Sequence, residues 1–109
     1  MAPAELEALL CAHPAVADAA VVPRPDPQAG EVPVAHVATR SQVGAAELEA
    51  WVAERVAPFK RLRGVRFVDQ VPRSPTGKLL RRVLVEAERA DVARAAARSE
   101  HEAEPAGVA

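Results

Sequence analysis

The residues most able to do chemistry are Gly77 and Lys78, which follow a loop punctuated by Pro72 and Pro75. Lys78 is one of only two lysines, whereas the other twelve basic residues are arginines. The lysine ammonium is a compact point charge on a flexible stem, while arginine presents a rigid planar fork. A lysine kept at this loop position therefore indicates a cation that meets a phosphate or an acyl phosphate.

The loop shares its lysine with the phosphate-binding P-loop but lacks the rest of that motif. A P-loop needs a glycine five residues before the glycine of its Gly-Lys pair, and a Ser or Thr after the lysine to hold magnesium. Pro72 and Leu79 stand at those two positions. Neither the nest of amide groups nor the metal ligand is then available, so the sequence excludes a P-loop ATPase.

Basic residues gather around this loop. Residues 60–82 contain eight basic side chains and one acidic side chain, a charge of +7 in a chain of net charge -1, so the remainder carries -8. Such asymmetry attracts anions, which include nucleotide and coenzyme phosphates, nucleic acid and acidic protein surfaces. The alternative is that these basic residues form an ordinary solvated surface without a ligand. The lysine at position 78 makes phosphate ligands the preferred interpretation. Aromatic residues make up only 3% of the chain, which argues against nucleic acid.

Hydrophobic periodicity predicts the elements that must position the loop. Helices are predicted over 4–13 and 45–57, the second ended by Pro58, and strands over 16–22, 32–37 and 65–68. A short sheet with helices against it, too small to be doubly wound, is an α+β fold. We expect a small mixed three-stranded sheet with flanking helices, in which Pro33 marks an edge strand or a bulge.

The loop leads into a third predicted helix, which Thr76 could cap. Its buried stripe is expected to consist of Leu80, Val83, Leu84 and Ala87. From about Arg89 the pattern fades into sequence rich in Ala, Glu and Arg. We therefore expect residues 1–89 to form the domain and residues 90–109 to form a frayed helix and a disordered tail.

Other side chains that could suggest a site are interpreted as structural. Cys11 lies in the apolar register of the first helix and is predicted to fill the core. Trp51 lies on the apolar face of the second helix, where a core role is expected rather than a stacking platform. His13, His36 and His101 match no zinc spacing with Cys11, so no metal site is expected.

Length and composition predict one cytoplasmic domain. A chain of 109 residues buries enough surface for a single modest core. No apolar run approaches the roughly 20 residues of a membrane span, and no secretion signal is visible. A single cysteine cannot form an internal disulfide. We expect no association with membranes.

Both ends of the sequence resemble one known family. The first end consists of APAELEALL at residues 2–10 and HPAVADAAVV at 13–22, and the second of APFKR at 57–61, FVD at 67–69 and VPRSPTGK at 71–78. In order and without gaps, they resemble the C-terminal lid domain of the AMP-forming acyl-adenylate enzymes, which include acyl-CoA synthetases, luciferases and peptide-synthetase adenylation domains. Within that family, the residues are most similar to those of coumarate:CoA ligases and related acid:CoA ligases.

The resemblance implies that Lys78 is the lysine of the adenylation step, positioned by Pro75, Thr76 and Gly77. In the family, a carboxylate attacks the α-phosphate of ATP, and the lid then rotates so that a thioester forms with CoA. ATP and CoA would be substrates of the complete enzyme. Mg²⁺ would be held by a large N-terminal adenylation domain, in cis or in trans, so this chain alone is expected to hold no cofactor.

Lys60 and Arg61 become candidates for the coenzyme phosphates, although we favour a solvated surface for both, and for Arg81 and Arg82. Family members carry a two-stranded hairpin and a hinge residue before the lid, and Met1 stands where that segment would end. We therefore expect a chain that neither binds ATP tightly nor turns over by itself. The alternative is a non-catalytic module that docks on a partner ligase and regulates it.

Overall fold

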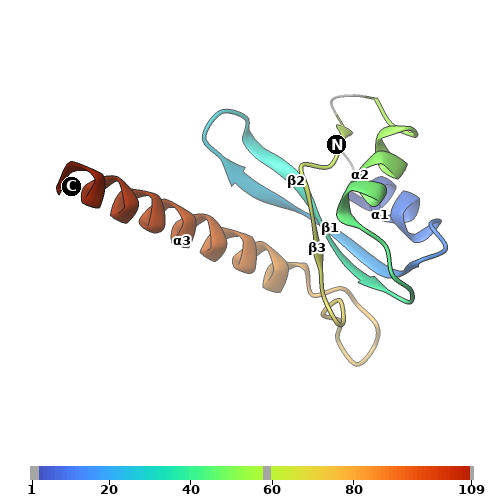
Figure 1. Ribbon diagram of the computed structural model, residues 1–109. Helices are drawn as coiled ribbons and strands as arrows, with labels where there is room; N and C mark the ends of the chain where they lie inside the picture. The colour runs from blue at the N-terminus through green and yellow to red at the C-terminus, as the bar shows by residue number, and fades with distance from the viewer. Residues whose placement is uncertain (1–2, 58–59, 109) are drawn as a thin grey trace.

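The computed structural model describes residues 3–57 and 60–108, with side chains as far as Ala97 (Figure 1). Its elements are α1 Pro3–Cys11, β1 Val16–Asp26, β2 Gly30–Thr39, α2 Ala45–Ala53, β3 Gly64–Phe67 and α3 Arg81–Val108. Within the described residues, no helix is long and apolar enough to cross a bilayer. The division into a domain over 1–89 and a frayed or disordered end over 90–109 stays a prediction.

The three strands form one mixed sheet in the order β1-β2-β3. β1 and β2 make an antiparallel hairpin that pairs Val16 with Thr39 at one end and Asp26 with Gly30 at the other. β3 runs parallel to β2 and begins opposite Val34. With helices against it, this sheet confirms the predicted α+β fold with a small mixed three-stranded sheet.

β1 continues beyond its predicted end at Val22, through two prolines, to Asp26. Pro23 lies directly opposite Pro33 of β2. Neither proline has an N–H, so the two fit opposite each other at a position without hydrogen bonds between the strands. The prediction that Pro33 marks an edge or a bulge is wrong, because β2 is the central strand and the register shifts beside Val16 instead.

Side chains alternate between the two faces of the sheet, and helices cover both faces (Figure 1). Ala19 and Val21 of β1 face α1 and α2. That larger core is completed by Leu6, Leu10, Val16, Ala35, Val37, Leu48, Val52 and Leu62. Ala20 and Val22 face α3 in a smaller core, whose other members are Ala38, Val71 and Leu84. Burial of both faces explains why β1 has a nearly continuous apolar run.

Trp51 of α2 packs against the larger core, as predicted. Its indole N–H donates to the carbonyl oxygen of Leu9 at 2.8 Å, and its side chain is partly buried. The polar end of the indole is therefore satisfied within the fold, as is usual for a tryptophan that packs on a core.

α2 ends at Ala53, before the predicted end at residue 57, and Pro58 lies outside the described residues.

Cys11 is exposed, so the prediction that it fills the core is wrong. Leu6 and Leu10 lie four residues apart, face the sheet and are at most 1% exposed. A residue next to Leu10 is rotated by about 100° around the helix axis. This rotation turns Cys11 toward solvent.

The buried side of α3 differs from the predicted stripe. Leu84 is buried as predicted. The members of the stripe that are exposed are Leu80, Val83 and Ala87. The helix begins at Arg81, so the prediction that Thr76 caps it is also wrong. One turn after Leu84 the buried residue is Glu88, whose exposed fraction is 3%.

Basic groups around Glu88 explain how a carboxylate occupies this buried position. Arg24 of β1 lies 2.8 Å from its Oε1, and Arg66 of β3 lies 3.4 Å from its Oε2. Burial alone would raise the pKa of Glu88, but hydrogen bonds from Arg24 and Arg66 outweigh this effect and hold the pKa below its usual value. Arg24 also pairs with Asp91 at 2.7 Å. These ion pairs fasten α3 across the sheet.

His36 of β2 is buried beside the same carboxylate, with Nε2 2.9 Å from Oε2 of Glu88. Within the described residues, neither ring nitrogen has a hydrogen-bond partner. Burial lowers the pKa of His36, and the negative charge of Glu88 offsets this only in part. In the folded chain, His36 therefore takes up a proton only at a lower pH than an exposed histidine does.

We expect Glu88→Gln to lower the free energy of unfolding by about 1 to 3 kcal/mol, the cost of losing hydrogen bonds between charged groups. Glutamine keeps the size of the side chain but loses the charge that pairs with Arg24 and Arg66. Urea unfolding at pH 7 measures the change. Glu86→Gln, on the exposed side of α3, is the matched control and should cost less than about 0.5 kcal/mol. Equal losses in the two variants would contradict the prediction.

We also expect the free energy of unfolding to fall as the pH drops from about 7.5 to about 5.5. The unfolded chain takes up a proton at His36 near its ordinary pKa of about 6.5, whereas the folded chain takes it up only at lower pH. More protons are then bound in the unfolded state, so stability is present above this range and lost on acidification. His36→Gln should flatten the dependence in urea unfolding. The same slope in His36→Gln as in the unsubstituted chain would refute this origin.

Candidate functional site

Residues 72–80, between β3 and α3, form a small hairpin with Lys78 on its second arm. The Leu80 N–H donates to the Pro72 carbonyl at 2.9 Å, and the Ser74 N–H donates to the Lys78 carbonyl at 2.8 Å. An antiparallel bridge lies between these two hydrogen bonds. Backbone hydrogen bonds therefore join the two arms of the hairpin.

The tip of this lysine hairpin is a three-residue loop that ends on a glycine. Gly77 has a φ of +90° and donates its N–H to the Ser74 carbonyl at 2.8 Å. Hairpin loops of this length commonly end on a glycine in the left-handed region. Pro75 has the fixed φ that the start of such a turn favours. The Ser74 Oγ lies 2.9 Å from the Thr76 Oγ1 and accepts the Lys78 N–H at 3.1 Å.

Lys78 presents its ammonium group to solvent. Its side chain is exposed, and the loop residues 75–77 are exposed too. In the part of the chain that the structure describes, no carboxylate lies within ion-pair distance of Lys78. An incoming anion could therefore meet this ammonium without first displacing an internal partner, and a charge-assisted contact of that kind is among the strong ones.

Two arginines flank Lys78 and join the hairpin to the N-terminal elements. Arg73 Nε and Nη2 each donate to an Asp18 carboxylate oxygen at 2.7 Å. These hydrogen bonds lower the pKa of Asp18. Arg81 donates to Glu7 at 2.9 Å. Arg81, which was predicted to belong to a solvated surface, has a side chain that is 39% exposed and also pairs with Glu7.

Sequence reasoning missed the two carboxylates, Glu7 and Asp18. Each lies more than fifty residues from its arginine, with separations of 74 and 55 residues. No local pattern connects residues so far apart. The signal that could have found them is the division of charge, since a remainder of -8 can pair with a segment of +7.

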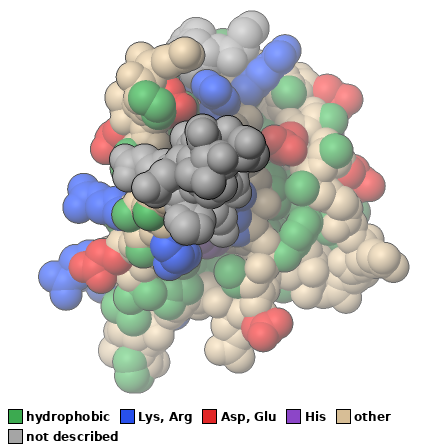
Figure 2. Space-filling model, turned by 60° about the vertical axis from the view of Figure 1, so that its left-hand side comes forward, with side chains coloured by type: hydrophobic (Ala, Val, Ile, Leu, Met, Phe, Trp, Pro, Cys, Tyr) green, Lys and Arg blue, Asp and Glu red, His purple; other side chains and the backbone are tan. Residues whose placement is uncertain are grey.

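Most basic residues of segment 60–82 are paired in the same way. Those with a carboxylate within 4.0 Å are Lys60, Arg66, Arg73, Arg81 and Arg82. On the face that Figure 2 shows, basic and acidic side chains are interspersed. Lys60 and Arg61 precede β3, whereas the lysine hairpin follows it. The two basic residues and the hairpin therefore lie at opposite ends of this strand (Figure 1). The structure does not bring them together with Lys78.

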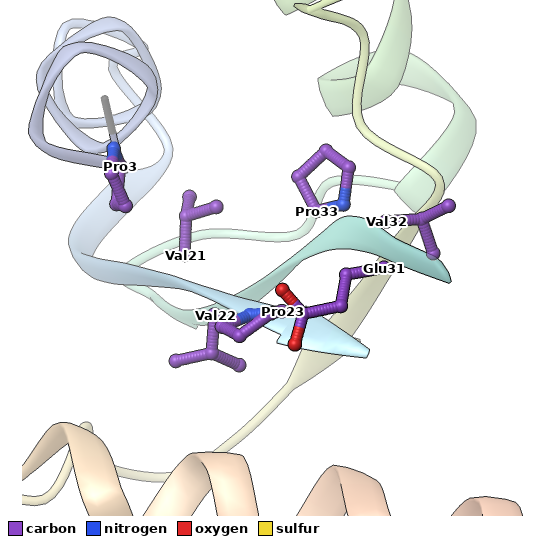
Figure 3. A pocket seen from close by; sticks show the side chains of 7 residues that line it. All are labelled: Pro3, Val21, Val22, Pro23, Glu31, Val32 and Pro33. Carbon is purple, nitrogen blue, oxygen red and sulfur yellow. The ribbon is translucent and has the colours of Figure 1, made fainter. Parts of the chain in front are cut away.

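Two hollows lie near the sheet. One, of about 350 Å³, lies between the start of α1 and the β1–β2 hairpin (Figure 3). It is lined by Glu31 and six apolar residues, Pro3, Val21, Val22, Pro23, Val32 and Pro33. The other, of about 400 Å³, lies at the base of the lysine hairpin and is lined by Ala17, Asp18, Ala38, Asp69, Gln70, Val71 and Arg73. Neither gathers metal ligands, because the described residues contain no suitable cluster of three or more His, Cys, Asp or Glu.

The fold and the hairpin together define a class of protein: a small α+β domain that presents one exposed lysine beside its sheet. The family model described as the AMP-binding enzyme C-terminal domain matches residues 5–78, so the match ends on Lys78. The chain belongs to this family. Its curated relatives include CoA ligases.

Known relatives agree with this assignment. The chain is 54% identical over 84 residues to a 4-coumarate--CoA ligase from Pinus taeda, a match that covers 77% of the chain and 16% of the ligase. A Mycobacterium tuberculosis fatty acyl CoA synthetase matches with a TM-score of 0.77 at 34% identity, over 82% of this chain and 18% of that one. The o-succinylbenzoate CoA synthetase from Bacillus subtilis, in complex with its acyl-adenylate intermediate OSB-AMP, matches with a TM-score of 0.73 at 39% identity, over 77% and 17%.

The chain therefore spans about one sixth of the length of the proteins it matches. The family match covers the three strands and the lysine hairpin as far as Lys78, and most of each relative is left unmatched. What those complete proteins bind and transform belongs to them as whole enzymes.

We expect Gly77→Ala to loosen the lysine hairpin, because alanine is strained at a φ of +90°. An added Cβ atom would meet nothing within 4 Å, so the cost lies in the backbone alone and is about 1 kcal/mol. Amide hydrogen exchange at Ser74 and Leu80 should then be about fivefold faster. Gly44→Ala is the matched control, since Gly44 has a φ of -90° and equal space. Hairpin exchange that is the same in both variants would rule the prediction out.

Proposed function

We propose that this chain is the C-terminal lid of an ATP-dependent, AMP-forming acid:CoA ligase, and that Lys78 supplies the charge for adenylation. The observation that carries the proposal is the exposed ammonium of Lys78 on a closed hairpin, at the last residue of the family match. Similarity to a 4-coumarate CoA ligase and to a CoA synthetase solved with an acyl-adenylate supports it.

In the proposed reaction, a carboxylate oxygen attacks the α-phosphorus of ATP, and pyrophosphate leaves with the electrons of the broken P–O bond. The thiol of CoA then displaces AMP from the acyl-adenylate to give acyl-CoA. The first step brings two anions together and gathers negative charge on the phosphoryl oxygens. A preorganised charge of the Lys78 kind typically contributes about 3 to 4 kcal/mol to such a transition state. Pro75, Thr76 and Gly77 hold the turn from which the ammonium projects.

The remaining parts of the active site are assigned to a large N-terminal adenylation domain, joined to this chain or supplied beside it. ATP and CoA are substrates of the complete enzyme, and Mg²⁺ would be held by the large domain. Lys60 and Arg61 stay candidates for the coenzyme phosphates, and a cytoplasmic location stays a prediction.

We expect Lys78→Ala to lower carboxylate-dependent AMP release by about a hundredfold to a thousandfold when the chain is combined with the large domain of a related acid:CoA ligase. The loss follows from removing the cation that offsets charge in the transition state. Arg82→Ala is the matched control, because the Arg82 side chain is 91% exposed and also carries one positive charge. The chain without the large domain should release no AMP.

Equal activity of Lys78→Ala and the unsubstituted chain would overturn the proposed role of the lysine. Detectable docking without activity in any variant would favour the alternative, a module that regulates a partner ligase without catalysis.

A further inference from the structure

The lysine hairpin is tied to the N-terminal elements at two points, one on each side of Lys78. Arg73, five residues before the lysine, meets both carboxylate oxygens of Asp18 on β1, each at 2.7 Å. Arg81, three residues after it, meets Glu7 of α1 at 2.9 and 3.4 Å. Arg73 thus holds the hairpin from its first arm, and Arg81 holds it from the first residue of α3.

Each carboxylate is itself held by the backbone of β1. The Glu7 carboxylate accepts the Val21 N–H at 2.7 Å, while Arg81 donates to the Val21 carbonyl. β1 is an edge strand, so these side chains satisfy backbone groups that no further strand pairs with. Asp18 accepts the Ala19 N–H at 2.9 Å. Neither acidic side chain can swing freely.

Arg73 also reaches the turn that carries the lysine. Its Nη1 donates to the Gly77 carbonyl at 3.1 Å, which belongs to the peptide group that joins Gly77 to Lys78. Residues 75–78 are all exposed, so no packing holds the tip, whereas Val71 before the hairpin is buried. One guanidinium group therefore connects β1 directly to the backbone of the lysine.

We propose that Arg73 and Arg81, through Asp18 and Glu7, are positioning residues that set where Lys78 stands relative to the sheet. A planar guanidinium that makes two parallel hydrogen bonds to a carboxylate fixes orientation as well as distance. A displacement of about 1 Å at a reacting group can cost about a hundredfold in rate. The effect on rate rests on the proposed function of Lys78, whereas the anchoring itself does not.

The first test uses this chain alone and measures amide hydrogen exchange in Arg73→Gln, Asp18→Asn and the double variant. Ser74 and Leu80, whose N–H groups close the hairpin, should exchange about two- to fivefold faster in each single variant. The double variant should exchange no faster than the faster single variant, because either change already removes the pair. Arg82→Gln is the control and should leave the hairpin unchanged.

Amides of the β1–β2 ladder should keep their rates in the same variants. Unchanged exchange in the hairpin of the folded variants would overturn the proposal. Equal acceleration in the ladder would also overturn it, because it would show a general loss of stability. If Arg73→Gln does not fold, Arg73→Lys gives the same comparison, since lysine keeps the charge but loses the fork.

The second test joins the chain to the large domain of a related acid:CoA ligase and measures acyl-adenylate formation. Arg73→Gln should lower kcat by about ten- to a hundredfold, while KM for ATP and for the acid changes by less than about twofold. Arg73→Lys should recover part of the lost kcat. A purely structural defect would instead change kcat and KM together. Lys78→Ala is measured in parallel.

The two tests separate the anchoring from the proposed function. If Lys78→Ala keeps full activity, the proposed function fails, while hydrogen exchange still decides whether the hairpin is anchored. If Lys78→Ala abolishes adenylation but Arg73→Gln keeps full kcat, the positioning role is overturned.

Discussion

The structure depends on covering both faces of a sheet that has only three strands. A sheet of this size is stable only when its apolar faces are packed against other elements. α1 and α2 cover one face and α3 covers the other, so the chain has to pass from the edge strand β3 to the far face. The lysine hairpin is part of that passage. The place of Lys78 therefore follows from how α3 and the hairpin are fixed to the sheet.

Ion pairs between distant parts of the chain provide that fixation. The buried carboxylate of Glu88 joins α3 to β1 and β3, and the carboxylates of Glu7 and Asp18 hold the hairpin on either side of its lysine. Charges that are divided unevenly along the sequence are thus largely matched within the fold. Lys78 stands apart from these pairs in the described part of the chain. Among the described residues, Lys78 thus offers an ammonium group without a carboxylate partner, whereas Lys60 lies 3.5 Å from Glu5.

Much of the fold and the centre of the site could be predicted from the sequence. Apolar periodicity located the three strands and the first two helices, because it depends on residues that are close in the chain. Pro75 and Gly77 set the turn of the hairpin through their own backbone preferences, whatever surrounds them. Short motifs at both ends of the chain, including the one that ends on Lys78, together indicated the family. Each of these features is encoded within a short segment.

The packing of α3 could not be predicted in this way. Helical periodicity selects Leu80 and Val83 for the core, yet both are exposed. The facing surface carries Arg24 and His36, and a buried Glu88 meets them. A charge is buried only where other elements provide partners for it. The arginine partners of Glu88 are Arg24 and Arg66, which lie 64 and 22 residues away in the sequence. The sequence by itself determined the elements, the turn and the lysine, since these depend on neighbouring residues. Only the tertiary structure decided which side chains are buried and which charges pair, since both depend on residues far apart in the chain.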